Sequence, residues 1–198
     1  MAKYFDQSIV DQLGAASKEI VAIRNRMLAL TNIDILDTDA ISSVFIYEVV
    51  KQYDSNYNIN FARNGEDAKS GTVIIEQKST RIKSPLTKSG KPRKGAGSEA
   101  AFQFHAHGEL DYPRYIFAAR SHESLDIVRI YDIQEESNRQ LVLDHLLEER
   151  RKWDARCLLD EKNKKRDIII LPEKYIQERM KFQPVETINN CLVMRDTK

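Results

Sequence analysis

Two acidic residues and a lysine have types and spacing suited to holding a metal ion. Asp67 precedes Glu76 by nine residues, and Glu76 precedes Lys78 by two. Residues i and i+2 of a strand point to one face, so Glu76 and Lys78 should project together, beside Asp67 at the preceding turn. Mg²⁺ prefers hard oxygen ligands and is commonly held by one or two carboxylates with a substrate phosphate. The spacing predicts a cation site beside a phosphate, to which the backbone carbonyl of Gln77 could add a ligand.

The neighbours of these residues extend the candidate site. Lys78 would hold or help to deprotonate an attacking water and would offset charge in a phosphorane-like transition state. Glu66 directly precedes Asp67 and competes with it as first acid, since only one of two adjacent residues in an extended turn can face the metal. Glu48 falls on the apolar stripe of a helix predicted over 39–53. It could sit at the edge of that stripe, pair with a buried base or reach a metal site.

A run of basic residues without any acidic one follows Glu76. Most of the run lies in 79–97, a segment rich in Ser, Pro, Gly and Lys that we expect to be a long loop. In a chain of net charge +1, such a local block fits contacts with DNA phosphates or, for its arginines, with guanine edges. The alternative is a disordered loop that reads no sequence. The candidate DNA-binding residues of this run are Arg81, Lys83, Lys88, Lys91, Arg93 and Lys94.

Hydrophobic periodicity and turn residues predict the elements that must position these side chains. Helices are expected over 7–30, 39–53, 98–108, 135–160 and 172–182. Strands are expected over 72–78, 114–120, 125–133 and 167–171, with a short extended piece at 59–61. The strands 114–120 and 125–133 should form an antiparallel pair, and the apolar segments Val73–Ile75 and Ile168–Ile170 should be central.

This mixed order predicts an α/β (α+β mixed) fold, a central mixed β-sheet flanked by helices. The length of 198 residues fits a single domain, 1–198, with a helical C-terminal extension from about 135. We expect no membrane partner, because no apolar run approaches the roughly 20 residues needed to cross a bilayer. Two cysteines, Cys157 and Cys191, and the lack of an apolar N-terminal signal predict a cytoplasmic protein. Without a glycine-rich phosphate loop, no nucleotide cofactor is expected.

The arrangement resembles the PD-(D/E)xK nuclease superfamily, which includes many Type II restriction endonucleases. Asp67, Glu76 and Lys78 match its motif, and Glu48 matches a glutamate on the helix that precedes that motif. The order of elements from residue 39 to 133 is also similar. Several branches of the superfamily carry a glutamine or a basic residue near the site, on the helix that follows the motif. The resemblance therefore makes Gln103 a further candidate DNA-binding residue, and the alternative is an ordinary polar residue of a helix. Glu66 stands where the family's proline would be. The resemblance implies a restriction-endonuclease-like core within a single nuclease domain, and Mg²⁺ as the cofactor.

The resemblance also implies an activity: Mg²⁺-dependent, site-specific hydrolysis of double-stranded DNA to 5′-phosphate and 3′-hydroxyl ends. Asp67, Glu76 and the Gln77 carbonyl would bind the metal, Lys78 would act on the water and Glu48 would support the metal shell. A palindromic site would call for a homodimer, because protein symmetry mirrors DNA symmetry. The alternatives are a repair or junction nuclease of the same superfamily and a non-catalytic nucleic-acid-binding protein on this fold.

Overall fold

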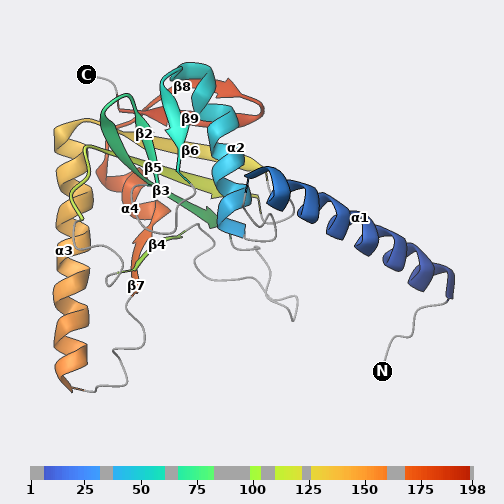
Figure 1. Ribbon diagram of the computed structural model, residues 1–198. Coiled ribbons are helices and arrows are strands. Elements are labelled where there is room, and N and C mark those ends of the chain that lie inside the picture. Colours follow the sequence, from blue (N-terminus) through green and yellow to red (C-terminus); the bar gives the residue numbers. More distant parts are fainter. Residues whose placement is uncertain are drawn as a thin grey trace. The chain divides into compact units, whose positions relative to one another are not determined.

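The computed structural model describes residues 7–31, 38–60, 67–82, 99–103, 110–121, 126–159 and 168–196 (Figure 1). The chain divides into two compact units, Met1–Ile41 and Ser42–Lys198. The first unit contains helix α1 (Gln7–Thr31), and helix α2 (Thr38–Tyr53) begins at its end. In the described ranges no helix is both long enough and apolar enough to cross a membrane.

A seven-stranded mixed sheet forms the centre of the second unit, in the order β1-β2-β3-β5-β6-β9-β8 (Figure 1). Its strands are β1 (Tyr57–Ile59), β2 (Ala68–Ser70), β3 (Val73–Arg81), β5 (Arg114–Arg120), β6 (Ile127–Ile133), β8 (Gln183–Ile188) and β9 (Cys191–Arg195). The first three form an antiparallel meander. β5 runs parallel to β3 and antiparallel to β6, and β9 runs parallel to β6. The predicted mixed sheet with flanking helices is confirmed.

Each face of this sheet has its own apolar core because side chains alternate along the strands. On one face, Ile75 and Ile116 pack with Ile46 and Val50 of α2. On the other face, Tyr115, Phe117 and Tyr131 pack against helix α3 (Glu136–Leu159), helix α4 (Glu173–Arg179) and Leu171 of strand β7 (Ile168–Pro172). Side chains of β3 therefore point toward α2 or away from it according to their position in the alternation.

Two tight turns use residues suited to positive φ. Gly71 (φ 59°) lies in the two-residue loop between β2 and β3. Asn189 and Asn190 (φ 50° and 63°) join β8 to β9. Positive φ at both central residues defines the type I′ hairpin turn, which asparagine tolerates better than most residues. The sequence therefore contained a hairpin signal at 189–190 that the periodicity argument did not use.

Most predicted helices and strands are present, but the predicted helix over 98–108 is wrong. Glu99–Gln103 forms strand β4, which pairs antiparallel with β7 (Ile168–Pro172) in a separate two-stranded sheet. A short apolar run does not distinguish a strand from a helix by periodicity, and here pairing with β7 decides. Ile168–Ile170 consequently lies outside the central sheet. The segment after residue 135 is also not only helical, because β8 and β9 complete that sheet.

Candidate active site

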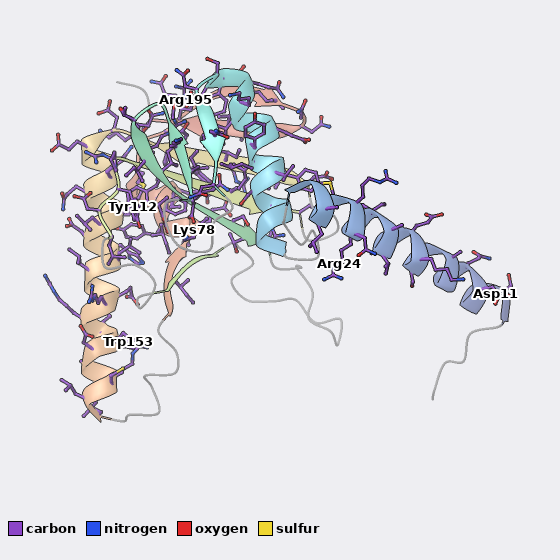
Figure 2. The ribbon with its side chains drawn as sticks, viewed as in Figure 1. Asp11, Arg24, Lys78, Tyr112, Trp153 and Arg195 are labelled. Atoms are coloured by element: carbon purple, nitrogen blue, oxygen red, sulfur yellow. The ribbon has the colours of Figure 1, made fainter. Side chains whose placement is uncertain are left out.

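Asp67, Glu76 and Lys78 meet where the start of β2 lies beside the middle of β3. Nζ of Lys78 donates a hydrogen bond to Oδ2 of Asp67 at 2.9 Å and lies 2.6 Å from Oε1 of Glu76. Asp67 immediately precedes β2, and the pairing of Ala68 with Ile75 brings it beside Glu76 on the neighbouring strand. Figure 2 labels Lys78 on β3. One ammonium group thus contacts two carboxylates that are nine residues apart in sequence.

The alternation along β3 separates Gln77 from its two neighbours. Glu76 and Lys78 point to the face that also carries Tyr115 and Phe117, their register partners on the parallel strand β5. Gln77 points to the face covered by α2. The strand therefore presents its charged pair on one side and a polar anchor on the other.

Gln77 supports the site from the opposite face of the sheet, the face that α2 covers. Its side-chain Oε1 accepts a hydrogen bond from the hydroxyl of Tyr57, and its Nε2 donates to Oγ of Ser43 at 3.1 Å. Its main-chain N–H donates to Oδ2 of Asp67 at 3.0 Å. In a strand the N–H and C=O of one residue point toward the same neighbour, so the Gln77 carbonyl also faces the side of Asp67. That direction supports the carbonyl as a metal ligand.

Burial shapes the electrostatics of the three charged groups. The side chain of Glu76 is 1% exposed, that of Lys78 18% and that of Asp67 31%. Burial raises the pKa of Glu76 to about 7, against the opposing attraction of Lys78. Burial alone would lower the pKa of Lys78, but the two carboxylates outweigh it, and the pKa is raised. Lys78 therefore stays cationic, while Glu76 titrates near neutral pH.

The donor set fits a hard cation. Among the described residues, Oε2 of Glu76 is buried without a hydrogen-bond partner, and such an atom calls for a ligand, a water or an ion. No group of three or more acidic, histidine or cysteine ligands exists within those residues. Two carboxylates and a carbonyl suffice for Mg²⁺, which keeps several of its waters. Because Asp67 is the more exposed acid, the site is open to solvent on the β2 side.

Glu48 does not lie where the sequence predicted. The buried side chains among the described positions of α2 are Ser42, Ile46, Val49 and Val50, whereas Glu48 is exposed. Ser43, the α2 residue that contacts Gln77, lies roughly 140° away from Glu48 around the helix. In addition, α2 covers the face of the sheet opposite to Glu76 and Lys78. The prediction that Glu48 sits on the apolar stripe is therefore wrong, and its support of a metal shell stays a prediction that this geometry disfavours.

The predicted DNA-binding residues fall mostly outside the described residues. These are Lys83, Lys88, Lys91, Arg93 and Lys94, together with Glu66, the rival first acid. Arg81 is at the end of β3, in register with Arg120 of β5. Gln103 is at the end of β4, in register with Ile168, and not on a helix. The side chains of Arg81 and Gln103 are outside the described part of the chain.

Sequence reasoning missed the residues that support the site. Tyr57 and Ser43 anchor Gln77 from distances of 20 and 34 residues along the chain. Tyr115 lies beside Glu76 on β5, and its hydroxyl donates to the carbonyl of Leu110. Periodicity predicted the strands but not their pairing, so no local signal identified these partners.

A second charged cluster has a structural role. Arg114 donates to both carboxylate oxygens of Asp132, at 2.8 and 2.7 Å, and to Oδ2 of Asp54 at 2.5 Å. Asp132 is fully buried and Arg114 nearly so. Such a bidentate, satisfied pair ties β5, β6 and the end of α2 together. Both oxygens of each carboxylate accept hydrogen bonds within the protein, so we do not assign this cluster to ligand binding.

No family model, no curated protein and no solved structure matches this chain.

Proposed function

We propose that this protein is a Mg²⁺-dependent, site-specific endonuclease acting on double-stranded DNA. The observation that carries the proposal is the contact of Lys78 with both Asp67 and Glu76. Two carboxylates provide hard ligands for a divalent cation, and an adjacent ammonium provides charge for a phosphate.

The element order supports a restriction-endonuclease-like core. Helix α2 precedes an antiparallel meander, the first acid stands directly before β2, and the Glu-x-Lys pair lies on β3. β5 then returns parallel to β3. This arrangement agrees with the resemblance drawn from the sequence, although a strand, β4, replaces the helix expected between β3 and β5.

The residues would divide the chemistry between them. Asp67, Glu76 and the Gln77 carbonyl would hold Mg²⁺, which supplies Lewis-acid stabilisation of negative charge on the phosphate. Lys78 would orient a water for in-line attack on phosphorus and offset the charge that develops on the phosphoryl oxygens. The P–O3′ bond breaks, leaving a 5′-phosphate and a 3′-hydroxyl. Gln77 keeps Asp67 in place through its main-chain N–H.

Plasmid cleavage by the purified full chain tests the proposal. We expect discrete fragments with Mg²⁺ and none with EDTA. Lys78→Met should slow cutting by roughly 10²- to 10³-fold, whereas replacement of Lys152, an exposed lysine on α3, by Met should leave the rate intact. Cleavage confined to branched or mismatched DNA would favour a repair or junction nuclease. DNA binding without cleavage in either Mg²⁺ or Mn²⁺ would leave a binding protein and overturn the nuclease assignment.

A further inference from the structure

A hollow of about 290 Å³ lies on the first two strands of the sheet, next to the candidate active site. It is lined by Asn58, Ile59, Asn60 and Lys69. Asn58 and Lys69 face each other across β1 and β2, and both are exposed. Among the residues that the structure describes, the lining supplies one ammonium group and two carboxamides and no carboxylate. This composition suits an anionic ligand that accepts hydrogen bonds.

The hollow and the acidic pair share one face of the sheet. Lys69 pairs with Ile74, which lies two residues before Glu76 on β3 and so points to the same side. Lys69 and Glu76 are therefore diagonal neighbours across the antiparallel pair of β2 and β3. Such neighbours are about 7–8 Å apart. Asp67, the acid open to solvent, lies two residues before Lys69. The open side of the site therefore faces the hollow.

We propose that this hollow binds a backbone phosphate of the nucleic-acid strand, adjacent to the phosphate that is cleaved. Lys69 supplies the charge. Oδ1 of Asn58 accepts a hydrogen bond from the N–H of Ile59 at 3.0 Å. The amino group of the same carboxamide then points away from the main chain and can donate to a ligand. The proposal rests on the proposed function and adds to it the position of the strand on β1 and β2.

Binding of a duplex to the full chain in Ca²⁺ without Mg²⁺, measured over a range of salt concentrations, tests this subsite. Each phosphate contact contributes roughly 0.9 to the slope of log K against log salt. Lys69→Met should lower that slope by about one and weaken binding roughly tenfold at low salt. Lys174→Met, an exposed lysine on α4, is the matched control and should change neither. Asn58→Asp should also weaken binding, because aspartate still accepts the Ile59 N–H but repels phosphate.

The outcomes separate the subsite from the proposed function. If the wild type binds and cuts while Lys69→Met and Asn58→Asp keep its slope and affinity, the subsite is wrong and the nuclease stands. If the wild type neither binds nor cuts DNA, both are overturned. The subsite is supported if Lys69→Met lowers the slope of log K against log salt and the variant at Lys174 does not.

A separate observation concerns α1, considered by itself. Seven of its apolar residues recur at alternating spacings of four and three, at Ile9, Leu13, Ala16, Ile20, Ile23, Met27 and Leu30. This 3.5-residue period is the seam of a left-handed coiled coil. Ile20 and Ile23 are 51% and 49% exposed. A helix with half-exposed isoleucines along a heptad seam has a surface suited to a partner of the same pattern.

We infer that α1 forms a parallel coiled coil with α1 of a second copy. With Ile20 at position a, Glu19 occupies position g of the preceding heptad. Arg24 occupies position e of the heptad that begins at Ile20. These are the positions that face each other across a parallel pair, and their charges are opposite. A second copy therefore matches the seam in both apolar pattern and charge.

Ile20→Asp and Val21→Asp make a matched test, because both side chains are 51% exposed but only Ile20 lies on the seam. By analytical ultracentrifugation of the full chain without DNA, the wild type should be a dimer. Ile20→Asp should raise its dissociation constant by at least roughly 30-fold, and Val21→Asp should barely change it. Oxidation of Ile23→Cys should give a cross-linked dimer, since a d position meets its own copy in a parallel pair, and Val21→Cys should not.

A monomeric wild type at high concentration would overturn the coiled coil. So would equal effects of Ile20→Asp and Val21→Asp, or a monomer destabilised by Ile20→Asp, which would show that the seam packs against its own chain. None of these results depends on nuclease activity.

Discussion

The main-chain N–H of Gln77 donates to Oδ2 of Asp67, the same carboxylate oxygen that accepts from Lys78. This bond joins the residue before β2 to the strand that carries Glu76 and Lys78. Asp67 is thereby oriented before any ligand binds, and a preorganised first acid is a requirement of a precise metal site. Its neighbour Glu66 lies outside the described residues.

Asp67→Asn and Glu66→Gln decide which acid acts. Asparagine still accepts the Gln77 N–H through Oδ1 but removes the charge that binds metal. We expect Asp67→Asn to lower the cleavage rate by roughly 10²-fold or more and Glu66→Gln to leave it unchanged. Single-turnover cleavage with saturating Mg²⁺ measures both. The opposite ranking would transfer the first-acid role to Glu66.

Lys78→Met should cost both activity and stability. Loss of its charge should slow cleavage by roughly 10²- to 10³-fold. Without its cation, ionised Glu76 stays buried, so the free energy of unfolding should fall on the order of 2 kcal/mol at pH 8. At pH 5, where Glu76 is protonated, the loss should shrink. Urea denaturation at the two pH values measures this loss. An equal loss of unfolding free energy at both pH values would contradict the view that the Glu76 carboxylate is buried in its charged form.

The raised pKa of Glu76 makes stability depend on pH in the absence of metal. The pKa is near the ordinary 4.5 in the unfolded chain and about 7 in the folded protein. The folded state therefore binds the Glu76 proton more tightly than the unfolded chain does. The stabilisation that this gives to the folded state is complete below about pH 4.5 and is lost as pH rises through about 7. The full loss is on the order of 3 kcal/mol. Glu76→Gln should flatten this part of the stability profile in EDTA, and an unchanged profile would place the titration elsewhere.

Glu48→Gln should cleave DNA at the wild-type rate, since Glu48 is exposed on a helix that covers the other face of the sheet. The same kinetic assay as for Asp67→Asn measures it. A loss comparable to that of Asp67→Asn would restore the role first predicted for Glu48.

Tyr57→Phe tests the anchor behind the site. It removes the hydroxyl that donates to Oε1 of buried Gln77, which leaves an acceptor without its donor and should cost roughly 1–3 kcal/mol of stability. The cleavage rate should fall less than in Lys78→Met, because Ser43 still holds the Gln77 amide. Denaturation and cleavage of the same preparation separate the two effects. Unchanged stability would show that Tyr57 does not anchor Gln77.

The elements that the sequence predicts well are those with a strong local pattern. The run Val73–Ile75 followed by Glu-x-Lys predicts a strand, and its i, i+2 spacing predicts that Glu76 and Lys78 share a face. Both are properties of consecutive residues. The helices α1, α2 and α3 have long periodic stretches and appear within two residues of their predicted bounds.

The elements that the sequence predicts poorly depend on partners far along the chain. β4 is a strand because it pairs with β7, about 70 residues later. Helical periodicity in the sequence puts Glu48 on an apolar stripe. Which side of α2 is buried, however, depends on where the helix packs against the sheet. Tyr57 and Ser43 support Gln77 only after the meander has formed. Contacts of this kind are tertiary and leave no mark in local spacing.

The parallel pairing of β9 with β6 has a consequence for how the protein is made. Some 60 residues separate these strands, and β9 covers an edge of β6 that holds buried Ile130. During vectorial synthesis that edge stays uncovered until residues 191–195 leave the ribosome. Exposed apolar edges of this kind invite pairing with other chains, so a nascent chain stalled after α3 is a natural client for chaperones.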